Sequence, residues 1–209
     1  APEGALIKST AIAKHRLDEA GVCDHTGPAR VFTSEAKAIQ AIKDGELQPG
    51  DVLVLIGIGP GAGMPETYQV TSALKYMKGG DQISLITDGR FSGVSTGACL
   101  GHVSPEAWAG GPVGKLRDGD SIRLLVDTVN LTGSIDVVDL EAAEFEAREW
   151  HPDLQHDDRI PADTRLWSAL QNASGGSWGG CVYDADRIAD LLAKGLAAEG
   201  SLPHDDSRI

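Results

Sequence analysis

The chain has 209 residues, with 18 Lys and Arg against 31 Asp and Glu, so its formal net charge at pH 7 is −13. Nucleic-acid binding depends on clustered basic side chains that release counterions from phosphates, and this charge argues against a nucleic-acid partner. The sequence contains no apolar run of the roughly 18 residues that span a bilayer, so we expect no membrane partner either.

The cysteines Cys23, Cys99 and Cys181 lie far apart and form no C-x-x-C pair. This spacing predicts neither a disulfide framework nor a self-contained zinc or iron–sulfur site, and it favours a reduced, cytoplasmic protein. We expect one domain over residues 1–200 and a flexible tail over residues 201–209, which has little to bury. The absence of an initiator Met favours a processed chain or an excised piece of a longer one.

Short apolar runs bounded by turn residues predict strands at residues 4–8, 29–33, 51–57, 82–88, 121–127 and 134–139. Helical spacing of apolar residues predicts helices at 34–44 and 65–77 between them. An acidic helix follows from residue 140 and stops before Pro152. A short helix from residue 163 then runs into a glycine-rich loop, and an amphipathic helix covers 184–200. This order is typical of a mixed sheet or barrel covered by helices rather than regular βαβ alternation.

The first glycine-rich turn follows the strand at 51–57 and reads GIGPGAGMPE from Gly57. A strand, glycines and a helix start place backbone N–H groups where a nucleotide or another anion could bind, and Gly57–Ala62 meets the relaxed pattern G-x-G-x-x-[G/A]. Pro60 removes one donor, and the carboxylate of Glu66 would repel a pyrophosphate. A simpler alternative is that Glu66 only complements the dipole of the following helix.

The second turn reads TDGRFSGVSTG from Thr87 and follows the strand at 82–88. Loops at strand ends commonly carry binding and catalytic groups, which makes its serines candidates. The alternative is a structural loop in which Asp88 makes an Asx turn, Gly89 and Gly93 supply positive φ, and Ser92 caps a short helix. That alternative leaves Arg90 unassigned.

A serine–histidine triad has no support in this sequence. Ser92 is not in the G-x-S-x-G context of a nucleophile elbow, and His102 is the only histidine close to it in sequence. We interpret His102 as a satisfied polar group and Ser104 as the cap of a helix that begins at Pro105.

Three segments carry a family resemblance: GPARVFTSEAKAIQAI from Gly27, GPGAGMPE from Gly59 and TDGRFSGVSTGACLGHVSPEAWAGGPVGKLRDGD from Thr87. They resemble the C-terminal domain of the dihydroxy-acid and phosphogluconate dehydratases. The segments TYQVTSALK, DTRLWSALQNASGG and CVYD are most similar to the sugar-acid branch of that family. The resemblance implies a swivelling β/β/α domain of the α/β class, with a mixed, barrel-like β-sheet flanked by helices.

Members of this family are hydro-lyases that convert a 2,3-dihydroxy acid to a 2-keto acid with Mg²⁺ and an iron–sulfur cluster, here expected to be [2Fe-2S]. The resemblance therefore implies a lyase that acts on a sugar acid, an aldonate such as D-xylonate, and forms its 2-keto-3-deoxy acid. By residue match it implies that Ser92 is the general base, that Glu66 is a magnesium ligand and that Ser95 contacts the substrate. We expect Asp88 and Arg90 to order the loop through a salt bridge or backbone hydrogen bonds, and Phe91 to anchor it in the core.

The cluster ligands and the other magnesium ligands of the family lie in an N-terminal domain that is absent from this sequence. The expected partner is therefore that domain of the same enzyme, the isolated fragment is expected to be inactive, and the enzyme is expected to be a homodimer or homotetramer. Two alternatives stay open. One is a nucleotide- or anion-binding module that uses the Gly57–Gly63 loop, and the other is a noncatalytic structural domain.

Overall fold

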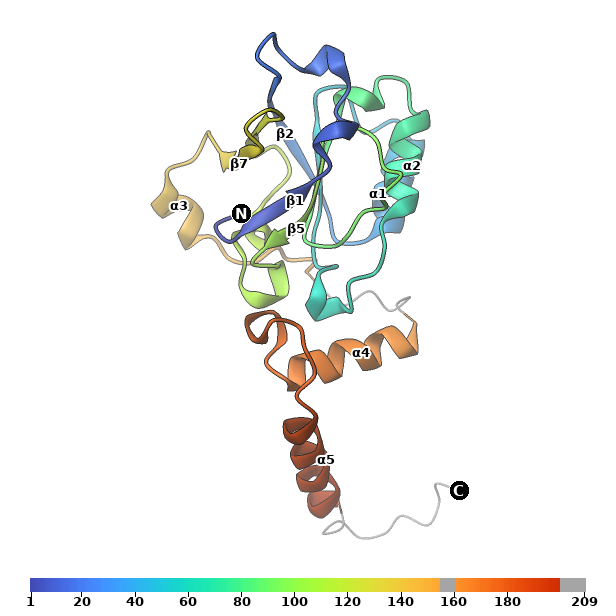
Figure 1. The fold of residues 1–209 in the computed structure, drawn as a ribbon, viewed down its shortest axis with the longest axis vertical. Coiled ribbons are helices and arrows are strands. Elements are labelled where there is room, and N and C mark those ends of the chain that lie inside the picture. The colour runs from blue at the N-terminus through green and yellow to red at the C-terminus, as the bar shows by residue number, and fades with distance from the viewer. Residues whose placement is uncertain (155–160, 200–209) are drawn as a thin grey trace.

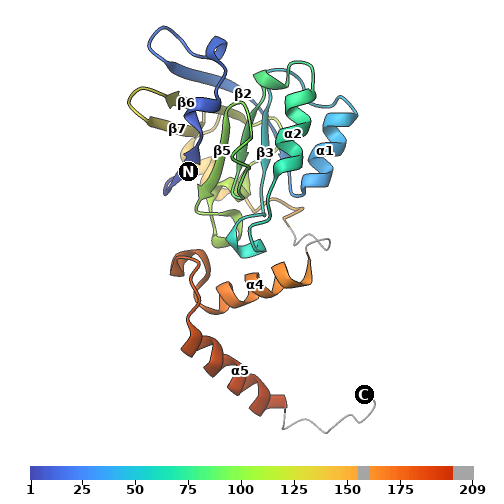
Figure 2. The ribbon, with the colours of Figure 1, turned by 45° about the vertical axis from the view of Figure 1, so that its right-hand side comes forward.

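The computed structural model describes residues 1–154 and 161–199, and the expected flexible tail at 201–209 lies outside the described residues. Seven strands form one sheet in the order β1-β5-β4-β3-β2-β6-β7. The strands are β1 (Gly4–Ile7), β2 (Val22–Phe32), β3 (Val52–Leu55), β4 (Ser84–Thr87), β5 (Cys99–Ser104), β6 (Ser121–Asp127) and β7 (Thr132–Val137). The sheet curls into a half-barrel (Figures 1 and 2), which confirms the predicted mixed, barrel-like architecture.

The long strand β2, next to the central strand β3, joins the parallel and antiparallel parts of the sheet. Its first seven residues, 22–28, pair antiparallel with β6, and its last four, 29–32, pair parallel with β3. Gly27 lies near this change of partner, where an added Cβ would be 2.0 Å from the carbonyl oxygen of Gly50. Strands β3, β4 and β5 continue in parallel, and β1 and β7 are the antiparallel edges.

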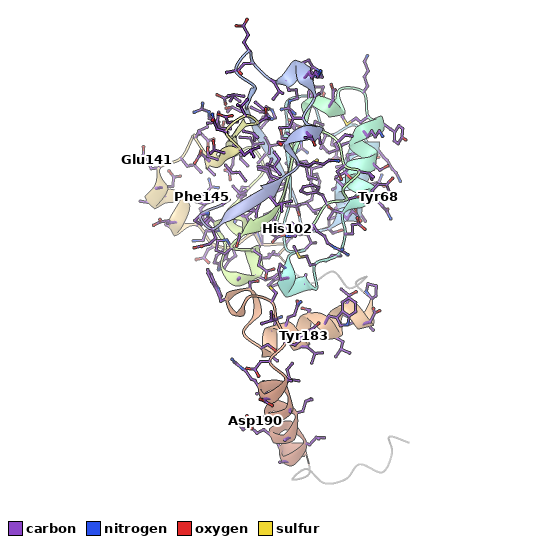
Figure 3. The ribbon with its side chains drawn as sticks, in the orientation of Figure 1. Tyr68, His102, Glu141, Phe145, Tyr183 and Asp190 are labelled. Carbon is purple, nitrogen blue, oxygen red and sulfur yellow. The ribbon has the colours of Figure 1, made fainter. Side chains whose placement is uncertain are left out.

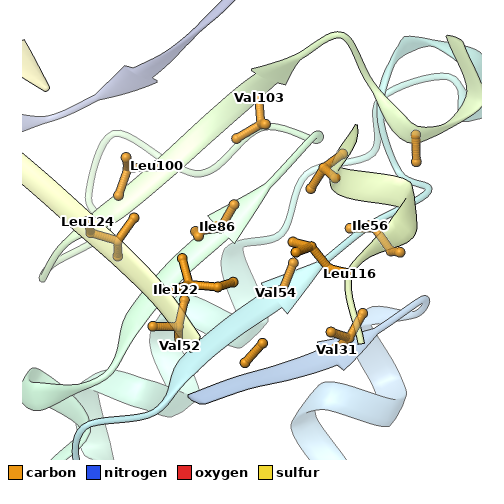
Figure 4. Close-up of a cluster of buried hydrophobic side chains, with 13 residues drawn as sticks. Val31, Val52, Val54, Ile56, Ile86, Leu100, Val103, Leu116, Ile122 and Leu124 are labelled. Carbon is orange, nitrogen blue, oxygen red and sulfur yellow. The ribbon is translucent and has the colours of Figure 1, made fainter. Parts of the chain in front are cut away.

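Alternating side chains of the strands fill two apolar layers. Val52 and Val54 of β3 point into the curl, together with Ile86, Ile122 and Leu124 (Figure 4). The intervening residues of β3, Leu53 and Leu55, face the opposite layer under the helices. This period of two is the geometry of a strand buried on both faces, and it explains why β3 is a continuous apolar run.

Five α-helices occur within the described residues: α1 (Glu35–Lys43), α2 (Tyr68–Tyr76), α3 (Ala142–Ala147), α4 (Ala162–Ala173) and α5 (Ala185–Glu199). Helices α1 and α2 cover the outer face of β2, β3 and β4, while α4 and α5 form an arm that extends away from the sheet (Figures 1 and 2). Tyr183 and Asp190 mark this arm in Figure 3. None of the helices described is both long and apolar enough to cross a membrane.

The structure corrects several predicted boundaries. Strand β5 was not predicted, and Ser104 is its last residue rather than a helix cap. The helix expected from Pro105 is a single 3₁₀ turn over Ala107–Ala109. His102, labelled in Figure 3, lies in β5 with an exposed side chain.

Candidate active site

The two glycine-rich turns lie side by side at the carboxyl edge of the parallel strands. Leu55 at the end of β3 is paired with Thr87 at the end of β4, so the chain leaves both strands at the same edge. Glu66 and Arg90 then form an isolated parallel bridge between the turns. The Nε of Arg90 also donates to the carbonyl oxygen of Met64 at 3.0 Å. The segments that carry Glu66 and Ser92 are therefore held against each other.

Asp88 lies at the start of the second turn and is only 1% exposed. Its carboxylate accepts the backbone N–H groups of Gly57, Ile58 and Ala107 at 3.0, 3.1 and 3.0 Å. The expected backbone hydrogen bonds of Asp88 are confirmed, and within the described part of the chain it makes no salt bridge with Arg90. Burial raises the pKa of Asp88 to about 6, because desolvation outweighs the three donors.

Glu106 is a second buried carboxylate, which sequence reasoning did not single out. It is 4% exposed, and its two oxygens accept the N–H of Gly61 at 2.8 and 2.9 Å. The hydroxyl of Ser177 also donates to it. Burial raises the pKa of Glu106 above its ordinary value. It lies two residues after the end of β5, a strand that was not predicted, and no local signal in the sequence marks its role.

The glycine spacing of the first turn reflects this packing rather than an anion site. The N–H groups of Gly57, Ile58 and Gly61, which a phosphate would need, are occupied by Asp88 and Glu106. An added Cβ at Gly59 would lie 2.4 Å from Oε2 of Glu106. These contacts disfavour the nucleotide-binding alternative, because its donors are already taken by internal carboxylates.

Glu66 is exposed and precedes α2, which begins at Tyr68 rather than at Pro65. No acidic side chain lies in the first turn of α2. The carboxylate of Glu35, from α1, accepts the N–H of Val70 at 3.2 Å instead. Burial raises the pKa of Glu35, and the nearby charge of Glu66 adds to this shift. The helix-dipole role proposed for Glu66 is thus filled by Glu35, whose action on another helix the sequence did not reveal.

Ser92 is half-buried in the second turn, where its Oγ accepts the N–H of Val94 at 3.3 Å. The next regular element is strand β5, so Ser92 does not cap a helix. Neither Gly89 nor Gly93 has a positive φ. Gly89 is instead required by space, because an added Cβ would lie 2.8 Å from Cδ1 of Ile58. The structural-loop alternative is therefore wrong in these details.

Ser95 and Phe91 turn inward from the same loop. Ser95 is 4% exposed, and its hydroxyl donates to Oγ1 of Thr71 on α2 at 2.9 Å. The ring of Phe91 is half-buried against the helix-side core, which confirms its predicted anchoring role. Of the three predicted site residues, Glu66 is exposed, Ser92 is half-buried and Ser95 is buried.

The described residues contain no group of three or more His, Cys, Asp or Glu side chains that could hold a metal ion. The exposed carboxylate of Glu66 makes no hydrogen bond or ion pair with any described residue, so it is available as one hard oxygen ligand of the kind that Mg²⁺ prefers. The cysteines do not suit a cluster. Cys23 and Cys99 are buried, and burial raises the pKa of the Cys99 thiol to about 12.

The helical arm forms a hydrogen bond with the first turn. The hydroxyl of Ser168 on α4 donates to the carbonyl oxygen of Gly61, the residue whose N–H is held by Glu106. Nε1 of Trp178 donates to the carbonyl oxygen of Ala109 at 3.1 Å. Residues from the last quarter of the sequence therefore help to fix the loop that leads to Glu66.

Comparison with known proteins gives a consistent set of relatives. Residues 1–177 match the family profile of the dihydroxy-acid/6-phosphogluconate dehydratase C-terminal domain. D-xylonate dehydratase YagF of Escherichia coli is 55% identical over 96% of this chain and 32% of its own length, and YjhG of the same organism is 52% identical over 92% and 31%. A dihydroxy-acid dehydratase of Agathobacter rectalis is 47% identical over 73% of this chain and 26% of its own. The chain thus spans about a third of the length of the two D-xylonate dehydratases.

Proposed function

Because the chain belongs to the dihydroxy-acid/6-phosphogluconate dehydratase family as its C-terminal domain, we propose that it is the C-terminal part of a sugar-acid dehydratase. The proposed substrate is an aldonate such as D-xylonate, since the two D-xylonate dehydratases match nearly the whole chain. The observation that carries the proposal is the bridge between the turns, which brings the segment of Glu66 beside that of Ser92.

In the proposed reaction, Ser92 acts as an alkoxide and accepts the proton that leaves C2 of the sugar acid, which turns it into a neutral hydroxyl. The C2–H and C3–O bonds break, and the departing hydroxide takes up the proton held by Ser92, so water leaves and the alkoxide is restored. The resulting enol moves its hydroxyl proton to C3 and becomes the 2-keto-3-deoxy acid. A bound Mg²⁺ would supply charge stabilisation for the enolate that develops beside the carboxylate. Glu66 would hold that ion through an oxygen ligand. Proximity of the two side chains would let the base act on a substrate that the metal orients.

We propose that Ser95 contributes to the substrate site, although its hydroxyl is already engaged in a hydrogen bond within the chain. Its hydroxyl donates to Thr71 in the structure, so a direct contact with substrate would require that hydroxyl to turn away from Thr71. Ser92, in the same loop, is half-buried rather than buried.

The remaining ligands are proposed to lie outside this chain. A [2Fe-2S] cluster and the other Mg²⁺ ligands would come from an N-terminal domain of the same enzyme, since the relatives are about three times as long. We further propose that the domain swivels over that partner, that the enzyme is a cytoplasmic homodimer or homotetramer, and that this chain alone is inactive.

The test uses the full-length enzyme that contains this chain, with D-xylonate and other aldonates as substrates and keto-acid formation as the readout. Ser92→Ala should lower kcat by roughly 10²- to 10⁴-fold, the range that a general base contributes, and leave the cluster absorption spectrum unchanged. Glu66→Gln should raise the Mg²⁺ concentration needed for half-maximal rate. Ser134→Ala, on the exposed edge strand β7, is the matched control.

Turnover close to wild type in Ser92→Ala would contradict the assignment of the base. The absence of keto acid from every aldonate with the wild-type enzyme would favour a noncatalytic domain. Binding of dinucleotides to the Gly57–Gly63 loop, measured by titration, would restore the anion-binding alternative.

A further inference from the structure

Two threonines one helical turn apart hold the loop of Ser92 against the start of α2. Thr67 and Thr71 are 1% and 2% exposed, and the spacing of four residues puts them on the same face of the helix. Oγ1 of Thr67 donates to the carbonyl oxygen of Arg90 at 2.7 Å. Oγ1 of Thr71 accepts from Ser95 at 2.9 Å and donates to the carbonyl oxygen of Tyr68 at 2.9 Å.

The hydroxyl of Thr67 does not make the hydrogen bond that is usual for a threonine at the N-cap of a helix. Thr67 is the N-cap residue of α2, and a threonine there ordinarily accepts an N–H of the first helical turn through its hydroxyl. Its side chain makes no such cap, and Glu35 from α1 takes the N–H of Val70 instead. The capping task is thus carried by another helix, and the hydroxyl of Thr67 is directed to the second turn.

The two threonine contacts bracket Ser92 in sequence. Arg90 lies two residues before the serine and Ser95 three residues after it, while the N–H of Ser95 donates to the carbonyl oxygen of Ser92 at 2.9 Å. The backbone N–H of Thr67 adds a second hydrogen bond to Arg90, at 3.2 Å. Thr67 also directly follows Glu66, so the same helix start fixes both the metal-ligand candidate and the base candidate.

We propose that Thr67 and Thr71 are positioning residues, which set the distance between Ser92 and Glu66 by hydroxyl hydrogen bonds on either side of the serine. This inference rests on the proposed function. In this proposal Ser95 helps to hold the loop through its hydrogen bond to Thr71. The proposal also explains why the hydroxyls of Ser95 and Thr71 are buried between α2 and a loop whose tip residues, Gly93 and Val94, are exposed.

The experiment compares valine and serine at each position in the full-length enzyme. Valine keeps the shape of threonine and removes the hydroxyl, whereas serine keeps the hydroxyl and removes a methyl group. Thr67→Val and Thr71→Val should lower kcat by about 10- to 100-fold, because small displacements of a catalytic group cost rate steeply. They should also enlarge the primary isotope effect with C2-deuterated D-xylonate, since proton abstraction becomes more fully rate-limiting.

Thr67→Ser and Thr71→Ser should keep kcat and the isotope effect close to wild type, even where Tm falls. Thr132→Val on the exposed edge strand β7 is the matched control and should change neither quantity. A kcat that simply follows Tm through all four variants would overturn the proposal, as would valine variants with wild-type kcat and isotope effect.

Ser92→Ala, measured in parallel, separates this inference from the proposed function. If Ser92→Ala is inactive while the valine variants behave as wild type, only the positioning role fails. If Ser92→Ala keeps its turnover, the assignment of Ser92 as the base fails and the positioning role falls with it, whereas the absence of keto acid with the wild-type enzyme would contradict the proposed function itself.

Discussion

Asp88 should make the chain less stable as the pH rises through the weakly acidic range. Burial raises its pKa from 3.8 to about 6, although three backbone N–H groups donate to its carboxylate. Because the pKa is higher in the folded chain than in the unfolded chain, the folded state holds this proton more tightly. The resulting stabilisation is complete below about pH 4 and is lost as the pH rises through about 6.

The size of the effect follows from the shift in pKa. One unit corresponds to about 1.4 kcal/mol, so a shift of about two units amounts to on the order of 3 kcal/mol in the free energy of unfolding. Roughly 1.4 kcal/mol of this is lost between pH 5 and pH 8. The range from pH 5 to pH 8 also lies above the isoelectric point of about 4.7, and it therefore avoids the pH at which the chain is least soluble.

The assay is urea denaturation of the wild-type chain and of Asp88→Asn at several values of pH between 5 and 8. Asparagine has the same size and does not titrate, and the other carboxyl groups titrate in both proteins. The difference between the two free energies of unfolding therefore isolates Asp88. Wild type should lose about 1.4 kcal/mol relative to the variant across this range. A difference that stays constant, or one in which wild type gains stability with pH, would refute the reasoning.

Two pairs of substitutions, at Glu35 and at two glycines of the second turn, test the packing of the turns by chemical denaturation. Glu35→Ala should destabilise the chain by about 1 kcal/mol, because the N–H of Val70 loses its acceptor. Glu35→Gln keeps an acceptor, so its free energy of unfolding should stay within about 0.5 kcal/mol of wild type. Equal losses in the two variants would contradict the capping role. Gly89→Ala should cost about 1–3 kcal/mol by overpacking against Ile58, while Gly93→Ala, with no atom within 4 Å of the added Cβ, should be neutral. Equal stability of the two alanine variants would argue against the close contact at Gly89.

The sequence predicted the strands whose character is local and missed those that depend on distant partners. The runs that became β3, β4 and β6 are apolar and bounded by turn residues, so their type could be predicted without tertiary information. The first seven residues of β2 contain Asp24, His25, Gly27 and Pro28, and they form a strand because β6 pairs with them. Strand β5 was hidden in the same way by Gly101 and His102.

The same division holds for the candidate site. The turns that carry Glu66 and Ser92 could be predicted, because turns at the carboxyl edge of parallel strands follow from the strands themselves. The residues that hold these turns in place were not predictable from local sequence. Glu35 comes from another helix, Glu106 follows the missed strand β5, and Ser177 comes from the arm.

The pairing of β2 also constrains the order in which the protein can fold. Its second half pairs with β3, the next strand in the chain. Its first half pairs with β6, the fourth strand after it, and cannot form that pairing until β6 is present. Pairing across such a long intervening segment is slow, because the loop must close before any contact rewards it. On a nascent chain the first half of β2 therefore lacks its antiparallel partner until β6 has been synthesised. The interior of the curl needs Ile122 and Leu124 of that strand, so it stays open to water until then.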